Sequence, residues 1–197
     1  MNKIIFIEGV SGVGKTTTTT HLFKKLQNAG YKVACYLEGD DNNPLDPFGG
    51  TYPPKIPIID YFETYKQYWQ IFMENEFDSD FMIIDGGLLH HQINDLIREY
   101  SASDIVIADY LSNLLTIIQP LNPILFYFSS DNVGKRLIQA RISRKQSAPT
   151  IDKIEFWENR ARVDLFVLER LPIRTHMINI GNGWDSIPKT IIEHIKL

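Results

Sequence analysis

The chain has 197 residues, a length that suits one compact domain with a full hydrophobic core. Its composition, 44% hydrophobic and 22% charged, is that of an ordinary soluble globular protein. The net charge of −4 argues against a general attraction to nucleic acids or anionic membranes, and no apolar stretch approaches the ~20 residues that span a bilayer. The single cysteine, Cys35, excludes an internal disulfide, and the N-terminus lacks the pattern of a secretory signal. We therefore expect a cytoplasmic protein without nucleic-acid or membrane partners, for which a homodimer is allowed.

The first apolar segment, residues 3–8 (KIIFIE), is expected to be a buried strand, and a glycine-rich motif follows it. Residues 9–16, GVSGVGKT, match the phosphate-binding pattern G-x-x-x-x-G-K-[ST] in full. The glycines allow backbone N–H groups to converge on an anion, and the dipole of the following helix adds to the attraction. The predicted phosphate site consists of Gly9, Ser11, Gly12, Val13, Gly14, Lys15, Thr16 and Thr17.

Three residues of this motif have separate predicted roles. Lys15 is expected to bridge the β- and γ-phosphates, the Thr16 hydroxyl to bind Mg²⁺, and the Thr17 hydroxyl to donate to the α-phosphate. They open a helix expected over 15–29, which begins with five threonines although threonine is a poor helix former. No chemistry is predicted for residues 18–20, which are expected to be held in the helix by tertiary contacts.

The second expected strand, residues 32–38, ends in acidic residues. Glu38 and Asp40 are two positions apart, so in an extended chain both side chains would face a cleft at the strand end. Either carboxylate could act as the general base, and the other would contact a metal or the acceptor. Beyond them, five of the ten prolines fall within 44–57, which predicts an irregular loop and a candidate wall of the substrate site.

A helix with an aromatic stripe, over residues 59–77, precedes a third strand over 81–85. That strand ends in Asp85, which has the form of a Walker B acid that holds Mg²⁺ directly or through water. The next two residues are glycines, 86 and 87, which could let a bulky acceptor approach. His90 and His91 lack a third ligand nearby in the sequence, so they are weak candidates for metal binding.

The fourth expected strand, 123–128, is followed by a basic segment, 131–152. Arg141, Arg144 and Lys145 stand at helical i, i+3 and i+4 spacing, which predicts one cationic helix face. Our hypothesis for this segment is a helical lid in which Arg141 and Arg144 stabilise the transferred phosphoryl group. The alternatives are a solvated helix face without function and a nucleic-acid patch, which the overall acidity of the chain disfavours.

A helix over 151–171, a strand over 176–180 and a last helix after residues 181–186 (GNGWDS) complete the chain. Leu165 and Leu168 are expected to lie on the apolar face of the first of these helices. Apolar strands that alternate with helices predict right-handed βαβ units. The sequence therefore predicts an α/β fold of three layers, with helices on both faces of one parallel sheet.

The glycine motif, the acidic end of the second strand and the basic segment after the fourth strand resemble the P-loop kinases of nucleosides and nucleoside monophosphates, such as thymidylate kinase and deoxynucleoside kinases. The segments YLEGD (36–40) and LNPILFYFS (121–129) are also similar to a group of uncharacterised bacterial P-loop kinase-like proteins. This resemblance implies a single P-loop NTPase domain over 1–197, a five-stranded sheet with the P-loop strand at its centre, a helical lid, and ATP and Mg²⁺ as cofactors.

The same resemblance implies roles for particular segments. Glu38 fits the place of the base in deoxynucleoside kinases, and residues 181–186 fit the place of the loop that contacts adenine. The arginine that often follows the Walker B acid in these kinases is replaced here by Gly86, so their specificity for monophosphates does not carry over.

The expected function is transfer of the ATP γ-phosphate to a small acceptor, with a nucleoside or a nucleoside monophosphate as the expected class. The first alternative is a kinase of another small molecule, such as an antibiotic, a sugar or a cofactor precursor. The second is a switch or binding protein that depends on a nucleoside triphosphate but is not a kinase. A GTPase is disfavoured because the guanine motif N/T-K-x-D does not occur in the sequence.

Overall fold

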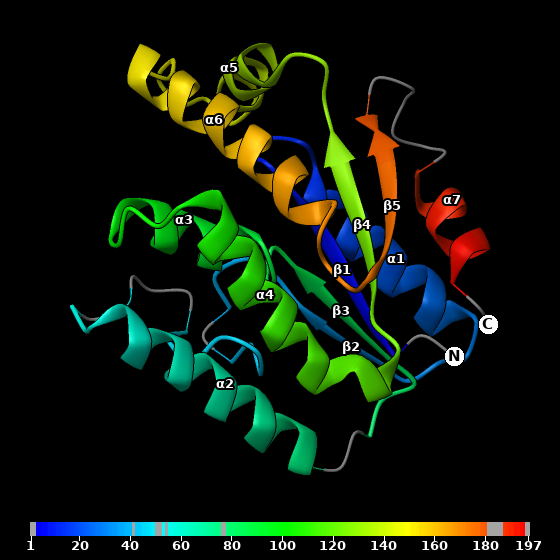
Figure 1. Cartoon of the computed structure of the whole chain (residues 1–197). Helices are drawn as coiled ribbons and strands as arrows, with labels where there is room; N and C mark the ends of the chain where they lie inside the picture. The colour runs from blue at the N-terminus through cyan, green and yellow to red at the C-terminus, as the bar shows by residue number, and fades with distance from the viewer. Residues whose placement is uncertain are drawn as a thin grey trace.

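Five parallel strands form one sheet in the computed structural model of the chain, which describes residues 3–40, 42–49, 53, 55–75, 78–180 and 187–195. The strand order is β2-β3-β1-β4-β5 (Figure 1). The strands are β1 (Ile4–Gly9), β2 (Val33–Tyr36), β3 (Phe81–Asp85), β4 (Ile124–Ser129) and β5 (Arg174–Asn179). The expected five-stranded parallel sheet, with the P-loop strand in the centre, is confirmed.

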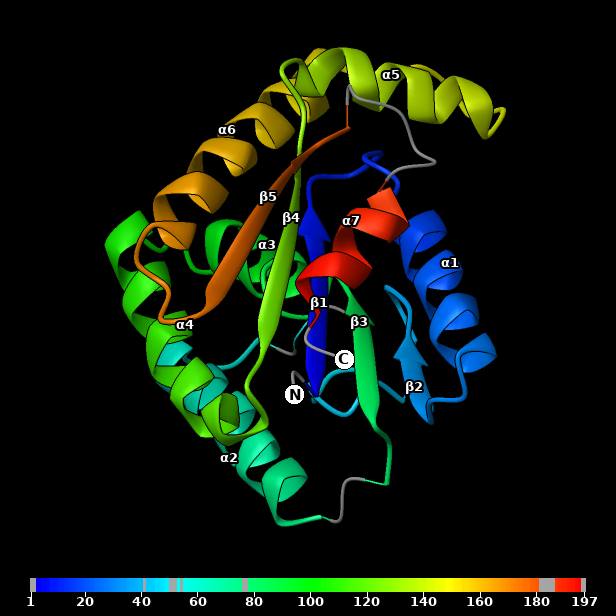
Figure 2. The ribbon, with the colours of Figure 1, turned by 90° about the vertical axis from the view of Figure 1, so that its right-hand side faces the viewer.

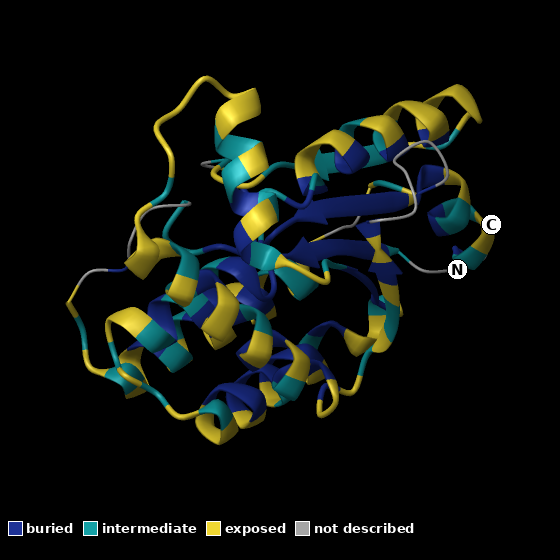
Figure 3. Cartoon of the chain, turned by 90° about the horizontal axis from the view of Figure 1, so that it is seen from above, coloured by how far each residue is buried: buried dark blue, intermediate teal, exposed yellow. Residues whose placement is uncertain are grey.

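In the described part of the chain, seven α-helices cover the two faces of this sheet (Figure 2). They are α1 (Lys15–Asn28), α2 (Ile58–Glu74), α3 (His90–Arg98), α4 (Asp104–Ile118), α5 (Val133–Ser143), α6 (Ile151–Leu168) and α7 (Ile187–His194), and a short 3₁₀ helix, η1 (Gln119–Leu121), follows α4. On one face Phe6 of β1 packs in a core with α2, α3, α4 and α6, and on the other Ile7 packs with α1 and α7. Because successive strand residues point to opposite faces, burial on both faces explains why β1, β3 and β4 are almost entirely apolar (Figure 3). Strand β5, at the edge of the sheet, carries exposed polar residues instead.

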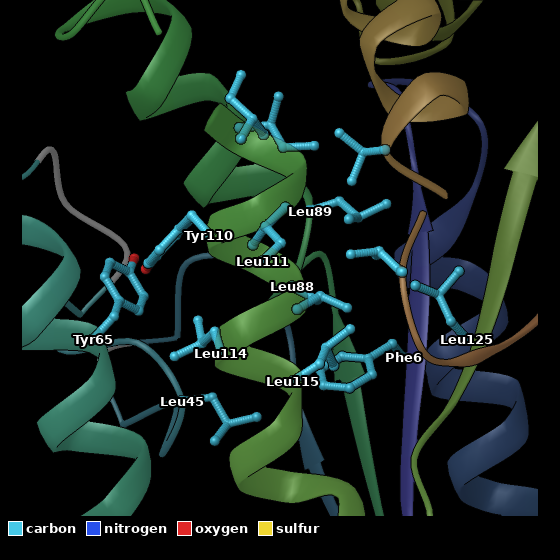
Figure 4. Packing of buried hydrophobic residues seen from close by; sticks show 14 of the residues in the cluster. Phe6, Leu45, Tyr65, Leu88, Leu89, Tyr110, Leu111, Leu114, Leu115 and Leu125 are labelled. Atoms are coloured by element: carbon cyan, nitrogen blue, oxygen red, sulfur yellow. The ribbon is translucent and has the colours of Figure 1, made fainter. Parts of the chain in front are cut away.

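The aromatic stripe of α2 belongs to the core rather than to a ligand site. Tyr61, Tyr65 and Trp69 are buried, whereas Tyr68 is exposed. Figure 4 shows Tyr65 facing the leucines of α4, with Phe6 of β1 beyond them. The indole N–H of Trp69 donates to the backbone carbonyl of Leu45 over 2.8 Å, so α2 also holds the proline-rich loop in place.

Burial accounts for two of the five threonines in the first turns of α1, and a hydrogen bond within the helix for a third. Thr18 and Thr19 are 3% and 0% exposed, and the Thr20 hydroxyl donates to the carbonyl of Thr16 over 2.9 Å. Tertiary contacts therefore stabilise a helical turn that the local sequence disfavours.

Two predictions about helix faces are wrong. Arg144 and Lys145 do not continue a helical face from Arg141, because α5 ends at Ser143 and Lys145 has a left-handed φ of 56°. On α6, Leu165 was expected to lie on the apolar face but is 46% exposed. The segment 181–186 lies outside the described residues. No helix in the described part of the chain is both long and apolar enough to cross a membrane.

We predict that Trp69→Phe lowers the free energy of unfolding by about 2–3 kcal/mol, because it shrinks a buried ring and leaves the Leu45 carbonyl without its donor. Urea denaturation followed by far-UV circular dichroism would measure the change. Tyr68→Phe, on the exposed side of the same helix, is the matched control and should change it by less than ~0.5 kcal/mol. Equal effects of both variants would contradict this account of the loop.

Candidate nucleotide site

The loop between β1 and α1 forms a cradle at the carboxyl end of the central strand. Gly12 and Gly14 have φ values of 87° and 85°, in the left-handed region that favours glycine, and Gly14 is the residue before the first turn of α1. The N-terminus of α1 therefore opens onto the loop, as an anion site requires. A cavity of about 230 Å³ lies here, lined by Ser11, Gly12, Gly14, Lys15, Thr16, Thr17, Glu38 and Arg144.

The two acidic strand ends reach this cradle from neighbouring strands. The Thr16 hydroxyl donates to Oδ2 of Asp85 over 2.6 Å, and Nζ of Lys15 lies 3.3 Å from Oε2 of Glu38. The first contact follows from strand pairing, since β1 and β3 are neighbours and Ile7 pairs with Asp85. The structure thus brings together Lys15, Thr16, Glu38 and Asp85, which the sequence had singled out at three separate places.

Asp85 has the properties of a ligand for a divalent cation. It is buried, and among the described residues its Oδ1 atom has no hydrogen-bond partner. Burial raises the pKa of Asp85, although the charge of Lys15 and the hydrogen bond from Thr16 oppose the shift. A carboxylate with a free oxygen beside a hydroxyl suits Mg²⁺, so these residues fit the cation.

The protein alone offers few ligands for that cation. Within the described ranges no group of three or more His, Cys, Asp or Glu residues could hold a metal ion. Mg²⁺ is commonly bound by one or two protein oxygens together with water and nucleotide phosphates. Metal binding at Asp85 and Thr16 is therefore expected to depend on a bound nucleotide.

Glu38 and Asp40 do not both face the cleft, so the expectation drawn from an extended chain is wrong. β2 ends at Tyr36, and the chain turns at Gly39, whose φ is 87°. The Asp40 carboxylate faces back and accepts the N–H of Leu37 over 2.6 Å, while Glu38 lies against Lys15. Of the two candidate bases, only Glu38 is at the cradle.

A histidine that the sequence analysis had set aside contacts Glu38. Nε2 of His90 lies 3.1 Å from Oε1 of Glu38. Burial lowers the pKa of His90 to about 3, so the ring is neutral and donates one N–H. Burial alone would raise the pKa of Glu38, but the hydrogen bond from His90 and the charge of Lys15 outweigh it and hold that pKa well below its usual range. Glu38 is thus an ionised carboxylate at neutral pH.

The turn after β3 is held from two sides by buried ionisable residues that the sequence analysis missed. Oε1 of Glu8 accepts the N–H groups of Leu88 and Leu89 over 2.7 and 3.0 Å. On the other side Arg160 of α6, 1% exposed, donates to the carbonyls of Leu89 and His90. The sequence did contain a signal for the Glu8 contact. Glu8 interrupts an apolar strand, and an ionisable group buried in this way must find partners.

Arg160 also has acidic and amide partners inside the protein. Its Nε donates to Asp164 over 2.8 Å and its Nη1 to the Asn94 side chain over 2.6 Å. Asp164 in turn accepts the hydroxyl of Tyr127 of β4 over 2.9 Å. Helix α6, strand β4, helix α3 and the turn after β3 therefore share one hydrogen-bonded network.

The helices of the expected lid pack against the cradle. A Cβ atom on Gly12 would lie 2.8 Å from Cβ of Ala140 in α5, so the phosphate loop and α5 are in close contact. Arg144, just after α5, lines the cavity of the cradle, whereas Arg141 donates to the carbonyl of Ser147 within the lid itself. The structure thus places Arg144 at the candidate phosphate site and Arg141 away from it.

The glycines after Asp85 are required by packing and do not open room for an acceptor. Gly87 is buried, and a Cβ atom there would lie 2.3 Å from Cγ2 of Ile84. Gly86 has a φ of 70° and lies under His90. The interpretation that these small residues admit a bulky acceptor is therefore wrong.

A second polar cavity, of about 280 Å³, lies where β4 and β5 end. It is lined by Ser130, Asp131, Asn132, Lys135, Arg136, Gln139 and Asn179. Arg136 is fixed there by a hydrogen bond to the carbonyl of Ile180 over 3.2 Å. In open parallel sheets, ligands bind outside the carboxyl ends of the strands, which is where both cavities lie.

The fold and the cradle define a P-loop NTPase. The family model of the CobQ/CobB/MinD/ParA nucleotide binding domain, CbiA, matches residues 4–165, and the chain belongs to this family. It is a nucleotide-binding protein.

Two solved structures show the same fold over nearly the whole chain. The YorR protein from Bacillus subtilis, in complex with phosphorylated GDP, is 15% identical, with 97% of this chain and 94% of that chain covered and a TM-score of 0.58. Thymidylate kinase from Candida albicans is 16% identical, with 98% and 91% covered and a TM-score of 0.57. No curated protein matches the chain significantly.

We predict that Mg²⁺ raises the affinity for ADP about tenfold less in Asp85→Asn than in the wild type, a difference of ~1.4 kcal/mol. The reason is that an amide is a poorer ligand for Mg²⁺ than a carboxylate. Isothermal titration calorimetry with ADP, with and without Mg²⁺, would measure it. The thermal midpoint should stay the same or rise, since the variant removes a buried charge. Asp78→Asn, which is exposed, is the control. An unchanged response to Mg²⁺ in Asp85→Asn would exclude Asp85 as the ligand.

A further prediction concerns Glu8, whose pKa burial raises from 4.5 to about 7. The folded state keeps a proton on Glu8 that the unfolded state loses above about pH 4.5. The contribution of this proton to the free energy of unfolding is therefore complete below pH 4.5 and is lost as the pH rises through 7. The loss amounts to about 3 kcal/mol. Glu8→Gln should remove this pH dependence, because an amide does not titrate. The fold should persist, since the amide oxygen can still accept the N–H groups of Leu88 and Leu89.

Urea unfolding of the wild type and of Glu8→Gln at several pH values between 4.5 and 8 would test this prediction. The difference between their free energies of unfolding should shift in favour of the variant as the pH rises. Glu63→Gln, on the exposed surface of α2, serves as the control for a general effect of charge. A constant difference across this range would show that Glu8 does not titrate in it.

Proposed function

We propose that the protein is an ATP- and Mg²⁺-dependent phosphotransferase that moves the γ-phosphate to a hydroxyl of a small acceptor, with a nucleoside as the acceptor class that we favour. The observation that carries the proposal is the ionised carboxylate of Glu38 at the mouth of the phosphate cradle, 3.3 Å from Lys15. A protein that only binds a nucleotide gains nothing from a carboxylate that repels its phosphates. A kinase can use that carboxylate as the base for the acceptor.

The remaining residues fit the nucleotide side of this reaction. Lys15 would hold the β- and γ-phosphates, and Thr16 and Asp85 would hold Mg²⁺, which neutralises charge on the phosphates. Arg144, which lines the cradle, would contact the transferred group with its planar guanidinium. The polar cavity beside Arg136 would receive the adenine ring of ATP, since this cavity lies at the strand ends next to the cradle loop and α5.

The carboxylate also favours one kind of acceptor. A neutral hydroxyl must lose its proton when its oxygen bonds to the γ-phosphorus, and Glu38 can accept that proton as the bond from phosphorus to the bridging oxygen of ADP breaks. A monophosphate acceptor needs no base, and its own charge would be repelled by Glu38. A hydroxyl acceptor is therefore preferred over a nucleoside monophosphate. A sugar or another small alcohol meets the same requirement.

A second candidate function is that of an NTP-dependent switch or binding protein. The family supports it, because its members include ATPases that are not kinases. Such a protein would hydrolyse ATP slowly and at a rate that small acceptors do not change.

The experiment that separates the two is ADP release from Mg·ATP by the purified protein, alone and with nucleosides, nucleoside monophosphates, sugars and aminoglycosides. The proposal expects one hydroxyl-bearing class to stimulate release at least tenfold, equivalent to ~1.4 kcal/mol of the barrier. Lys15→Ala should abolish the stimulation, and Lys66→Ala, on the exposed face of α2, should leave it unchanged. Slow release that is the same with every acceptor would contradict the phosphotransferase and support the switch.

A further inference from the structure

We infer that His90 is the positioning residue of Glu38. It holds one oxygen of the carboxylate, so that the other oxygen faces the acceptor once a bound nucleotide has replaced Glu38 as the partner of Lys15. The inference rests on the proposed function and names a residue on which its base depends. His90 does not touch the reacting atoms in this account; it acts through Glu38.

The two oxygens of Glu38 have different partners. Oε2 lies 3.3 Å from Nζ of Lys15, and Oε1 lies 3.1 Å from Nε2 of His90. A P-loop lysine binds phosphates, so the contact between Lys15 and Oε2 must be given up when a nucleotide enters. The contact to His90 does not compete with the nucleotide and can persist. Oε2 is then left free to accept a proton, while Oε1 is held.

Glu38 needs such a contact because little else orders its side chain. It lies beyond the end of β2, beside a turn at Gly39, and its side chain is 38% exposed. A glutamate side chain without partners loses considerable rotamer entropy when it is fixed in one position. Without His90, the carboxylate would follow Lys15 or turn toward solvent as the nucleotide binds.

His90 is itself held rigidly. Its side chain is 7% exposed, and its ring stacks on that of Trp157 in α6, with 5.3 Å between the centroids and 27° between the planes. Its backbone carbonyl accepts a hydrogen bond from Arg160, one turn further along α6. Among the described residues, Nδ1 has no hydrogen-bond partner, so Nε2 makes the only hydrogen bond of the ring.

These contacts link helix α6, and through it the neighbouring helix α5 of the expected lid, to Glu38. Trp157 holds the ring of His90, and Arg160 holds its backbone, so α6 sets where the donor to Glu38 lies. Since α5 packs against Gly12 of the cradle and also against α6, a movement of the lid would displace the phosphate loop and the base together.

A double-mutant cycle tests the inference. His90→Phe keeps a ring for Trp157 but removes the donor, and His90→Gln keeps an N–H donor but removes the ring. In the otherwise unchanged protein, His90→Phe should lower kcat for ADP release with the stimulating acceptor about tenfold and change the KM for ATP less than about twofold. His90→Gln should recover most of that loss. In a Glu38→Gln background, His90→Phe should have almost no further effect.

Additive losses from His90→Phe in both backgrounds, or no recovery by His90→Gln, would overturn the inference, because a merely structural role does not depend on Glu38. His21→Phe and His21→Gln, at an exposed position of α1, are the matched controls and should leave kcat unchanged. A wild-type protein that no acceptor stimulates would instead refute the proposed function.

The hydrogen bond itself can be tested without turnover. Long-range ¹H–¹⁵N NMR spectra should show His90 as the neutral Nε2–H tautomer, with an Nε2–H proton that shifts strongly in Glu38→Gln. A His90 spectrum that does not respond to Glu38→Gln would overturn the inference, whatever the activity of the protein.

Discussion

A buried guanidinium organises the functional end of this molecule. Arg160 is 1% exposed, and a charge removed from water must be matched by hydrogen bonds and an opposite charge. Arg160 finds Asp164 on its own helix, Asn94 on α3, and the carbonyls of the turn after β3. Because every one of these partners must be present at once, the position of α6 over the sheet and the path of the chain after Asp85 are fixed together.

Two sets of contacts connect the position of α6, which Arg160 fixes, to the nucleotide cradle. One passes from the turn after β3 to Glu8, which accepts two of its N–H groups just before the phosphate loop begins. The other passes from Trp157 through the ring of His90 to Glu38 and so to Lys15. Helix α6, strand β3 and the phosphate loop therefore form a single packed unit, and the candidate base Glu38 belongs to it.

The P-loop fold by itself does not decide between a kinase and a switch. It provides an anion site at the start of α1 and a carboxylate beside it, and both features are compatible with either function. The proposed phosphotransferase rests instead on the carboxylate of Glu38, which opposes phosphate binding by charge and also pairs with Lys15. In that proposal, the affinity for the nucleotide that this carboxylate costs is offset by its role in the chemistry that follows binding.

The sequence determined the features that depend on local chain properties. Glycines at fixed spacing encode the phosphate loop, and apolar runs that alternate with helices encode the parallel sheet, so the fold, Lys15, Thr16 and Asp85 could be predicted. Only the tertiary structure decided that Asp40 turns back to Leu37, that Arg144 rather than Arg141 lines the cradle, and that His90 holds Glu38. The contacts of Arg144 and His90 join segments far apart in the chain, and they depend on how each helix packs on the sheet, which no local pattern encodes. Asp40 contacts a residue only three positions away, and there the extended-chain pattern failed because the chain turns at Gly39.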